Sequence, residues 1–310
     1  MDLSINLGRL KLKNPVTVAS GTFGYAEEFK DLVKLNALGA IITKTITKEP
    51  RLGNAAPRLA ETCSGMLNAI GLQNEGLDNF LKVKLPKLEK IGTKIIVSVS
   101  ANSASEFIYC VKKLEDCGVE AIELNLSCPN IKYAKLKKSN KAKAKIFAQD
   151  ADDTYALVNA VAKKTDAVLI AKLSPNVTDI AEIAIAAEKA GADALSLVNT
   201  ISAMAIDIDT GKPKLANVSG GLSGPAIKPI AVKMVYDVYK AVRIPIIGMG
   251  GIMNADDAIE FMIAGATAVS VGTANFVNPR VSMEVIEGIR NYCKKKKLKN
   301  LKQLTGTLRT

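Results

Sequence analysis

Short apolar runs rich in β-branched residues recur along the chain, with polar and then amphipathic stretches between them. Most of these runs are continuously apolar instead of alternating, which is typical of parallel strands buried on both faces. We predict eight strands from them, near Val16–Ala19, Ala40–Thr43, Ile95–Val99, Ala121–Leu126, Ala167–Lys172, Ala194–Val198, Pro245–Gly248 and Ala268–Val271.

Helical patterns separate several of these strands. Ser105–Cys117, Thr178–Ala190 and Asn254–Ala264 each end immediately before a glycine, the usual stop of a helix, and Asn254 is a typical N-cap. An eightfold alternation of strand and helix predicts an α/β fold, the (β/α)₈ or TIM barrel.

The first residues follow a different pattern. Ile5–Leu12 alternates with period two around Gly8, which predicts an N-terminal β-hairpin that could plug the barrel floor. We expect one domain over residues 1–310, since no low-complexity linker interrupts the chain. Its start lacks the pattern of a signal peptide, and no apolar run reaches the roughly 18 residues of a membrane span. We therefore expect a cytoplasmic protein.

Histidine does not occur in this sequence, and this excludes several mechanisms. The chain by itself has no Ser-His-Asp triad, no Cys-His pair and no histidine metal site. Its five cysteines include no Cys-x-x-Cys pair, which argues against a disulfide framework, a zinc site or an iron–sulfur cluster. Acid–base chemistry near neutral pH then falls to a carboxylate, lysine, tyrosine or cysteine.

The net charge is +12, and much of the excess lies in residues 132–145, with seven lysines, and 294–302, with six. Such segments serve nucleic acids, anionic substrates or acidic partner proteins, or are simply solvated surface. Tyr133 is the one aromatic residue in them, so the stacking surface for single-stranded nucleic acid is missing. We expect neither a nucleic acid nor a membrane as a partner.

Polar or small residues follow almost every predicted strand. In β/α barrels the catalytic and binding groups come from these carboxyl ends, so the pattern indicates an enzyme. The residues are Ser20, Lys44-Thr45, Ser98, Asn125, Lys172, Asn199-Thr200, Gly250-Gly251 and Gly272-Thr273.

The glycines after the last two strands favour a bound phosphate, because small residues let backbone N–H groups approach an anion; tight turns are the alternative. Lys44 and Lys172 follow apolar runs and should point into the same mouth. We expect a negative ligand near them, the alternative being a structural carboxylate.

Asparagines gather at the same predicted strand ends, at positions 68, 125, 130 and 199. Their amides both donate and accept, which suits the edge of a pyrimidine or a flavin, although each alone is also a common turn residue. Cys128 follows the fourth strand and precedes Pro129 on this lysine-rich side. Nearby positive charge favours a thiolate, so Cys128 is a candidate base; a structural thiol is the alternative.

Four stretches carry a resemblance to a known family. They are Asn125-Leu126-Ser127-Cys128-Pro129-Asn130, Asn68-Ala69-Ile70-Gly71-Leu72, Asn199-Thr200 and the glycine loop Ser219-Gly220-Gly221-Leu222-Ser223-Gly224-Pro225-Ala226-Ile227-Lys228-Pro229. Together they resemble the dihydroorotate dehydrogenase family, from about Leu7 to Asn278. The cysteine in the first stretch is similar to the soluble class 1 enzymes, and the form of the last resembles the NAD-linked type B catalytic subunit more than the fumarate-linked type A.

This resemblance implies oxidation of (S)-dihydroorotate to orotate with FMN, in pyrimidine biosynthesis. Cys128 would remove the proton from C5 while hydride passes from C6 to the flavin N5, and Lys172 would lie near the flavin N1. The implied FMN contacts are Ser20, Lys44, Thr45, Ser98, Asn125, Lys172, Val198, Gly224, Gly250, Gly251, Gly272 and Thr273. The implied substrate contacts are Lys44, Asn68, Ala69, Ile70, Gly71, Leu72, Asn125, Asn199 and Thr200.

Two positions depart from the family pattern. Ser98 stands where the family usually has asparagine, so its side chain reaches less far toward the flavin. Residues 131–147 carry lysines where the family usually has a glycine-rich loop over the site.

The resemblance also implies partners. A type B enzyme passes its electrons to a separate subunit with FAD and a 2Fe–2S cluster, and this chain has no cluster motif or Gly-x-Gly-x-x-Gly fingerprint of its own. We expect a homodimer that forms a heterotetramer with that subunit, with NAD⁺ as final acceptor.

Two other functions fit part of the pattern. A tRNA dihydrouridine synthase is also an FMN barrel, but it normally has glycine where this chain has Ser127, and it has a further C-terminal domain. The second is a non-catalytic barrel that binds a phosphorylated ligand and whose thiol is inert.

Overall fold

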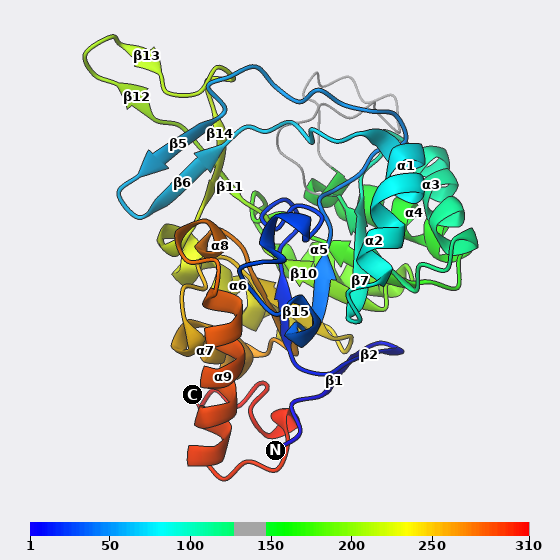
Figure 1. The fold of residues 1–310 in the computed structure, drawn as a ribbon, viewed down its shortest axis with the longest axis vertical. Coiled ribbons are helices and arrows are strands. Elements are labelled where there is room, and N and C mark those ends of the chain that lie inside the picture. Colours follow the sequence, from blue (N-terminus) through cyan, green and yellow to red (C-terminus); the bar gives the residue numbers. More distant parts are fainter. Residues whose placement is uncertain (127–146, 310) are drawn as a thin grey trace.

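The predicted strands form a closed parallel barrel (Figure 1). The structure is a computed structural model that describes residues 1–126 and 147–309. Around the barrel the order is β10-β15-β16-β3-β4-β7-β8-β9, and each strand begins and ends within one residue of its predicted run. The prediction of a (β/α)₈ barrel is therefore confirmed. The strands are β3 (Val16–Val18), β4 (Ala40–Ile42), β7 (Lys94–Val99), β8 (Ala121–Asn125), β9 (Val168–Lys172), β10 (Ala194–Leu197), β15 (Ile246–Met249) and β16 (Ala268–Val271).

Helices cover the outside of the barrel. The three predicted ones are α3 (Ala104–Asp116), α5 (Ile180–Lys189) and α7 (Ala255–Ala264), and the side chain of Asn254 accepts a hydrogen bond as the N-cap of α7. In the described part of the chain, no helix combines the length and the apolar character needed to cross a bilayer.

The remaining helices connect strands or close the chain. They are α1 (Gly76–Asn79), a π-helical turn (Phe80–Lys84), α2 (Leu85–Glu89), α4 (Ala151–Ala162), α6 (Lys228–Ala241), α8 (Ala274–Val277) and α9 (Val281–Lys295). Short 3₁₀ turns lie at Glu27–Phe29, Leu35–Ala37, Phe147–Gln149, Pro225–Ile227 and Leu301–Gln303.

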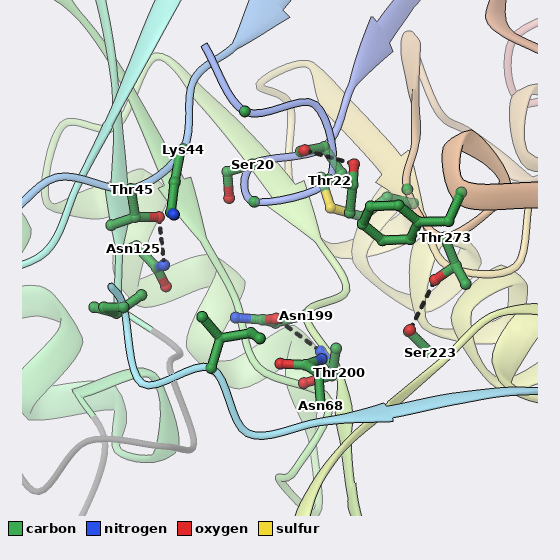
Figure 2. Close-up of a pocket in the computed structure, with 18 of the residues that line it drawn as sticks. Ser20, Thr22, Lys44, Thr45, Asn68, Asn125, Asn199, Thr200, Ser223 and Thr273 are labelled. Carbon is green, nitrogen blue, oxygen red and sulfur yellow. Dashed lines mark hydrogen bonds between the residues drawn. The ribbon is translucent and has the colours of Figure 1, made fainter. Parts of the chain in front are cut away.

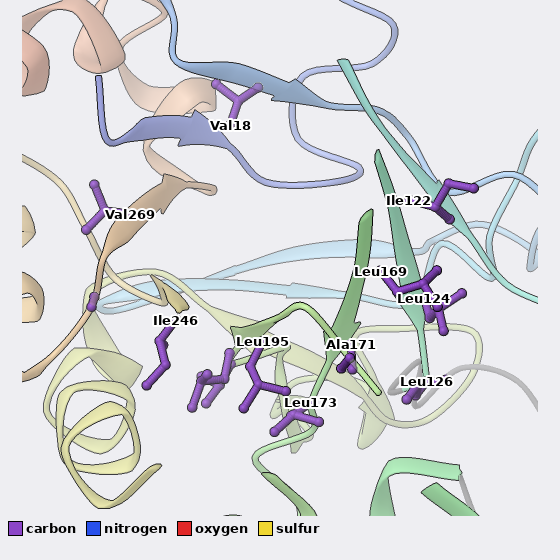
Figure 3. Close-up of a cluster of buried hydrophobic side chains, with 14 of the residues drawn as sticks. Val18, Ile122, Leu124, Leu126, Leu169, Ala171, Leu173, Leu195, Ile246 and Val269 are labelled. Atoms are coloured by element: carbon purple, nitrogen blue, oxygen red, sulfur yellow. The ribbon is translucent and has the colours of Figure 1, made fainter. Parts of the chain in front are cut away.

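Each barrel strand contributes to two separate apolar layers, because alternate side chains point to opposite faces. In β8, Ile122 and Leu124 belong to the layer between barrel and helices, which Figure 3 shows, whereas Ala121 belongs to the barrel interior. Glu123 and Asn125 share the alternation of Ala121 and are also buried. Polar groups therefore enter the barrel interior on the strand that leads to the predicted catalytic motif.

The N-terminal hairpin plugs one end of the barrel, as predicted. Strands β1 (Ile5–Leu7) and β2 (Leu10–Leu12) pair antiparallel, and Leu7 and Leu12 are fully buried among the side chains of the barrel interior. The hairpin thus supplies the apolar floor of the barrel.

At the other end lies a small antiparallel sheet that the sequence pattern did not predict (Figure 1). Its strands are only three or four residues long and two of them contain glycine, so the sequence shows no long alternating pattern there. Gly221 lies so close to Thr200 that an added Cβ would meet the Thr200 hydroxyl at 1.9 Å. The stretch Ser219–Pro229, one of the four that carry the family resemblance, is therefore partly a strand. The sheet order is β11 (Ile201–Ala203), β14 (Gly220–Ser223), β6 (Gly65–Asn68) and β5 (Leu59–Thr62), and a hairpin of β12 (Ile206–Asp207) and β13 (Lys212–Pro213) extends beside it.

The plug predicts a difference between two neighbouring substitutions in β2. Leu12→Ala should lower the free energy of unfolding by about 2–5 kcal/mol, because it leaves a cavity beneath the barrel interior. Lys11→Ala, on the exposed face of the same strand, should change it by less than about 0.5 kcal/mol. Urea unfolding followed by circular dichroism measures both values. Equal effects would mean that the hairpin is not part of the core.

Candidate active site

A cavity of about 830 Å³ opens at the carboxyl ends of the barrel strands, beneath the small sheet. This volume lies within the range of small-molecule and cofactor sites. Most of the residues predicted for the site line its wall, from many separate parts of the chain. They are Ser20, Lys44, Thr45, Asn68, Ile70, Gly71, Leu72, Asn125, Lys172, Val198, Asn199, Thr200, Gly224, Gly250, Gly251, Gly272 and Thr273.

Among the described residues, two that were predicted for the site do not line the cavity, namely Ser98 and Ala69. Ser98 is fully buried behind the wall, where its hydroxyl bonds to Thr45 and Glu123. Ala69 is fully buried and packs with Leu67 instead. Cys128, the predicted base, lies outside the described residues, as do Asn130 and nearly all of the lysine-rich segment 131–147.

Lys172 has a structural partner, which was the alternative to a bound anion. Its ammonium lies 3.8 Å from the carboxylate of Glu123, and it donates a hydrogen bond to the Ser20 hydroxyl at 3.1 Å. Both side chains of the ion pair are almost completely buried. The lysine still lines the cavity, so it contributes to the wall while its charge is partly balanced from within the barrel.

Lys44 lies in a different electrostatic environment. Burial lowers the pKa of this lysine below its ordinary value of 10.5, and the charge of Arg58 lowers the pKa further. Glu28 and Glu75 oppose this shift, with smaller effects than burial has. The described residues therefore compensate the Lys44 ammonium incompletely, and an anion bound in the cavity would favour its charged form.

The asparagines and hydroxyls form the polar wall that Figure 2 shows. Asn125 donates from its amide nitrogen to the Thr45 hydroxyl at 3.0 Å, and the carbonyl oxygen of Asn199 accepts from the backbone N–H of Thr200 at 2.8 Å. Asn68, at the end of β6, donates to the carbonyl of Gly221 in the neighbouring strand. The small antiparallel sheet β11-β14-β6-β5, called the mouth sheet below, therefore holds Asn68 opposite the barrel residues.

Backbone glycines form another part of the cavity wall. Gly250 and Gly251 have φ values of +125° and +82°, which side chains rarely tolerate. A Cβ on Gly251 would lie 2.8 Å from the carbonyl oxygen of Gly224, so three predicted glycines lie close together. Beside them, Thr273 donates a hydrogen bond to Ser223 at 2.7 Å (Figure 2). Small residues and backbone amides there leave room for a phosphate.

Other wall residues were missed in the sequence. Most, such as Tyr25, Met66 and Phe276, lie away from the predicted strand ends and come to the cavity through tertiary folding. Burial, with Glu75 and Glu28 nearby, raises the pKa of Tyr25 to about 12, so Tyr25 stays a neutral phenol near pH 7. Glu123 was also missed, although a glutamate inside an apolar strand was itself a signal of a buried partner.

The comparisons with known proteins agree over the whole chain. A family model described as dihydroorotate dehydrogenase matches residues 2–292. A protein of Caldicellulosiruptor bescii is 50% identical over 308 residues, which cover 99% of both chains. One of Desulforamulus reducens is 51% identical, covering 99% of this chain and 98% of that protein. One of Bacteroides thetaiotaomicron is 49% identical, covering 99% of both. Each is named dihydroorotate dehydrogenase B (NAD(+)), catalytic subunit. This chain belongs to the dihydroorotate dehydrogenase family.

Proposed function

We propose that this chain oxidises (S)-dihydroorotate to orotate in pyrimidine biosynthesis, as the catalytic subunit of a type B, NAD-linked enzyme. The observation that carries this function is the cavity, which combines Lys44, three of the predicted asparagines and a glycine-lined wall. An anionic cyclic amide matches the lysine and the asparagines, and a phosphate matches the glycines. Full-length similarity to proteins named type B catalytic subunits supports the choice.

We propose FMN as the cofactor of this cavity. The glycines at 224, 250, 251 and 272, with Thr273, would receive its phosphate, and Ser20, Thr45, Asn125 and Lys172 would contact its ring. The close packing at Gly251 supports this fit, because a side chain there would collide with the chain behind it. FMN, when bound, supplies the acceptor for the hydride from C6. Ser98 lies behind Thr45, so it would act on the ring only through that residue.

The side chains of the protein supply binding and proton transfer in this proposal. Lys44 would pair with the substrate carboxylate, and the Asn68–Leu72 loop, Asn125 and the Asn199-Thr200 pair would bond its amide groups. Ala69 supports this loop from the core. Cys128 would accept the proton from C5, as its place in the stretch that resembles the family motif implies.

We further propose an external path for the electrons. A separate subunit with FAD and a 2Fe–2S cluster would carry them to NAD⁺, in a heterotetramer built on a homodimer of this chain. The relatives are named catalytic subunits, which supports the existence of a partner. The fumarate-linked type A enzyme is the alternative for the acceptor.

Anaerobic mixing with (S)-dihydroorotate tests the function. The visible absorption band of the purified flavoprotein should bleach, and the (R) enantiomer is the control that should leave it unchanged. A screen of NAD⁺, fumarate and quinone as oxidants, with and without the partner subunit, then identifies the acceptor. An unchanged spectrum with the (S) enantiomer would contradict the proposed activity.

Cys128→Ala tests the base. We expect this variant to retain FMN and to lose flavin reduction by about 10²–10⁴-fold, the usual contribution of a general base. Cys128→Ser should recover activity only at high pH, because serine ionises far less readily than cysteine. Stopped-flow reduction measures both, with Cys117→Ala, an exposed thiol, as the matched control. Reduction of Cys128→Ala at the parental rate would exclude Cys128 as the base.

The lowered pKa of Lys44 predicts a pH dependence of ligand binding. Orotate should require the ammonium form, so its affinity should fall as pH rises through the lowered pKa, beginning below 10.5. Lys44→Met should bind more weakly at pH 7 and remove this part of the pH profile. Titration of the flavin spectrum from pH 7 to 10 measures it, with Lys48→Met as the control. A profile identical in parent and Lys44→Met would exclude Lys44 from the binding site.

A further inference from the structure

A carboxylate that the proposed reaction does not use lies inside the barrel. Glu123 is fully buried and accepts hydrogen bonds from the hydroxyls of Ser98 at 3.0 Å and Ser196 at 2.8 Å. The ammonium of Lys172 lies 3.8 Å from it. Burying a charge costs several kcal/mol unless it is paired and hydrogen-bonded, so a glutamate here requires these partners.

The contacts of Glu123 determine the direction of a longer hydrogen-bond chain. An ionised carboxylate only accepts, so the single hydroxyl proton of Ser98 is donated to Glu123. Ser98 must then accept from the Thr45 hydroxyl, which lies 2.9 Å away. Thr45 in turn accepts from the amide nitrogen of Asn125 at 3.0 Å. Each proton in the chain therefore has one position.

This series of hydrogen bonds ends on the cavity wall, because Thr45 and Asn125 both line the cavity. The nitrogen of Asn125 is held toward Thr45, so its carbonyl oxygen points away from Thr45 (Figure 2). The wall consequently presents one pattern of donors and acceptors to a ligand. If Glu123 were replaced by a group that donates, the same atoms could bond in the opposite direction.

Glu123 reaches the wall by a second path through Lys172. This lysine lines the cavity and donates to Ser20, another wall residue. The carboxylate below partly balances the charge that the lysine presents to a ligand, so Glu123 also contributes to the electrostatic potential in the cavity.

We propose that Glu123 is a positioning residue of the cofactor site, which directs the Ser98–Thr45–Asn125 chain and holds Lys172 at the wall. This role rests on the proposed function in one respect, namely that the ligand is FMN. It gives Ser98 a task that differs from the direct flavin contact expected from the family: the short hydroxyl connects the wall to the buried charge.

Two serines provide a matched test. Ser98→Ala and Ser196→Ala each remove one buried hydroxyl that donates to Glu123, but only Ser98 continues to Thr45. Ser98→Ala should bind FMN about three- to tenfold more weakly than Ser196→Ala, the effect of one hydrogen bond. Titration of the apoproteins with FMN measures the dissociation constants, and thermal unfolding checks that both variants fold. Equal dissociation constants would overturn the directed chain.

The electrostatic role of the Glu123–Lys172 ion pair can be tested by the midpoint potential of bound FMN, because a loss of packing would not shift this potential in opposite directions in the two variants. Glu123→Gln removes a negative charge and should shift the midpoint potential of bound FMN to a more positive value, whereas Lys172→Met should shift it to a more negative one. A tenfold change in the reduction equilibrium equals about 30 mV for two electrons. Shifts in the same direction, or no shift in Glu123→Gln, would overturn the electrostatic role.

Failure of the parent protein to bind FMN would contradict the proposed cofactor. The pairing of Glu123 with Lys172 can still be tested without any ligand, by protein unfolding. Unfolding of Glu123→Gln, Lys172→Met and the double variant forms a mutant cycle. The double variant should be less destabilised than the sum of the two single variants, because each single change leaves a buried charge or dipole unpaired. Additive effects would overturn the pairing.

Discussion

Burial of the barrel strands on both faces is the constraint on which the rest of this structure depends. Ile122 and Leu124 meet the helices, and Ala121 fills the interior with the hairpin leucines. These layers are buried, so a polar side chain within them is costly without a hydrogen-bond partner in the protein. Polar groups therefore concentrate where the strands end, and that edge is the cavity.

Glu123 is a fully buried carboxylate that connects the interior to this edge. Its carboxylate is bonded by hydroxyls from two other strands and lies beside Lys172. Because both ions are buried, neither can be removed without leaving the other unbalanced. The interior of the barrel thus acts on the cavity through named contacts, in addition to supporting it by packing.

The same environment explains the contrast between the two lysines of the site. Lys172 is almost completely buried but has a carboxylate beside it, whereas Lys44 is less buried and has Arg58 in its surroundings. Lys172 therefore belongs to a built-in ion pair, whereas Lys44 lines the cavity and forms no ion pair with the residues that the structure describes. In the sequence, Lys44 and Lys172 both follow apolar runs, so their positions alone did not distinguish these two roles.

The barrel strands and three of the helices were predictable from the sequence, because each short apolar run must be buried and α3, α5 and α7 each end close to a glycine. The family was recognisable too, since its motifs are contiguous stretches such as Asn125–Asn130. The mouth sheet was not predictable from the sequence, because short strands such as Gly220–Ser223 become regular only by pairing with β6 and β11.

By itself, then, the sequence determined the barrel, its plug and most of the residues at its mouth, through local patterns of burial and contiguous motifs. Tertiary structure alone decided that Ser98 lies behind the wall, that Glu123 balances Lys172 and that the chain from Glu123 reaches Asn125. The physical reason is that hydrogen-bond direction and charge compensation depend on distances between separate strands, which spacing along one strand does not encode.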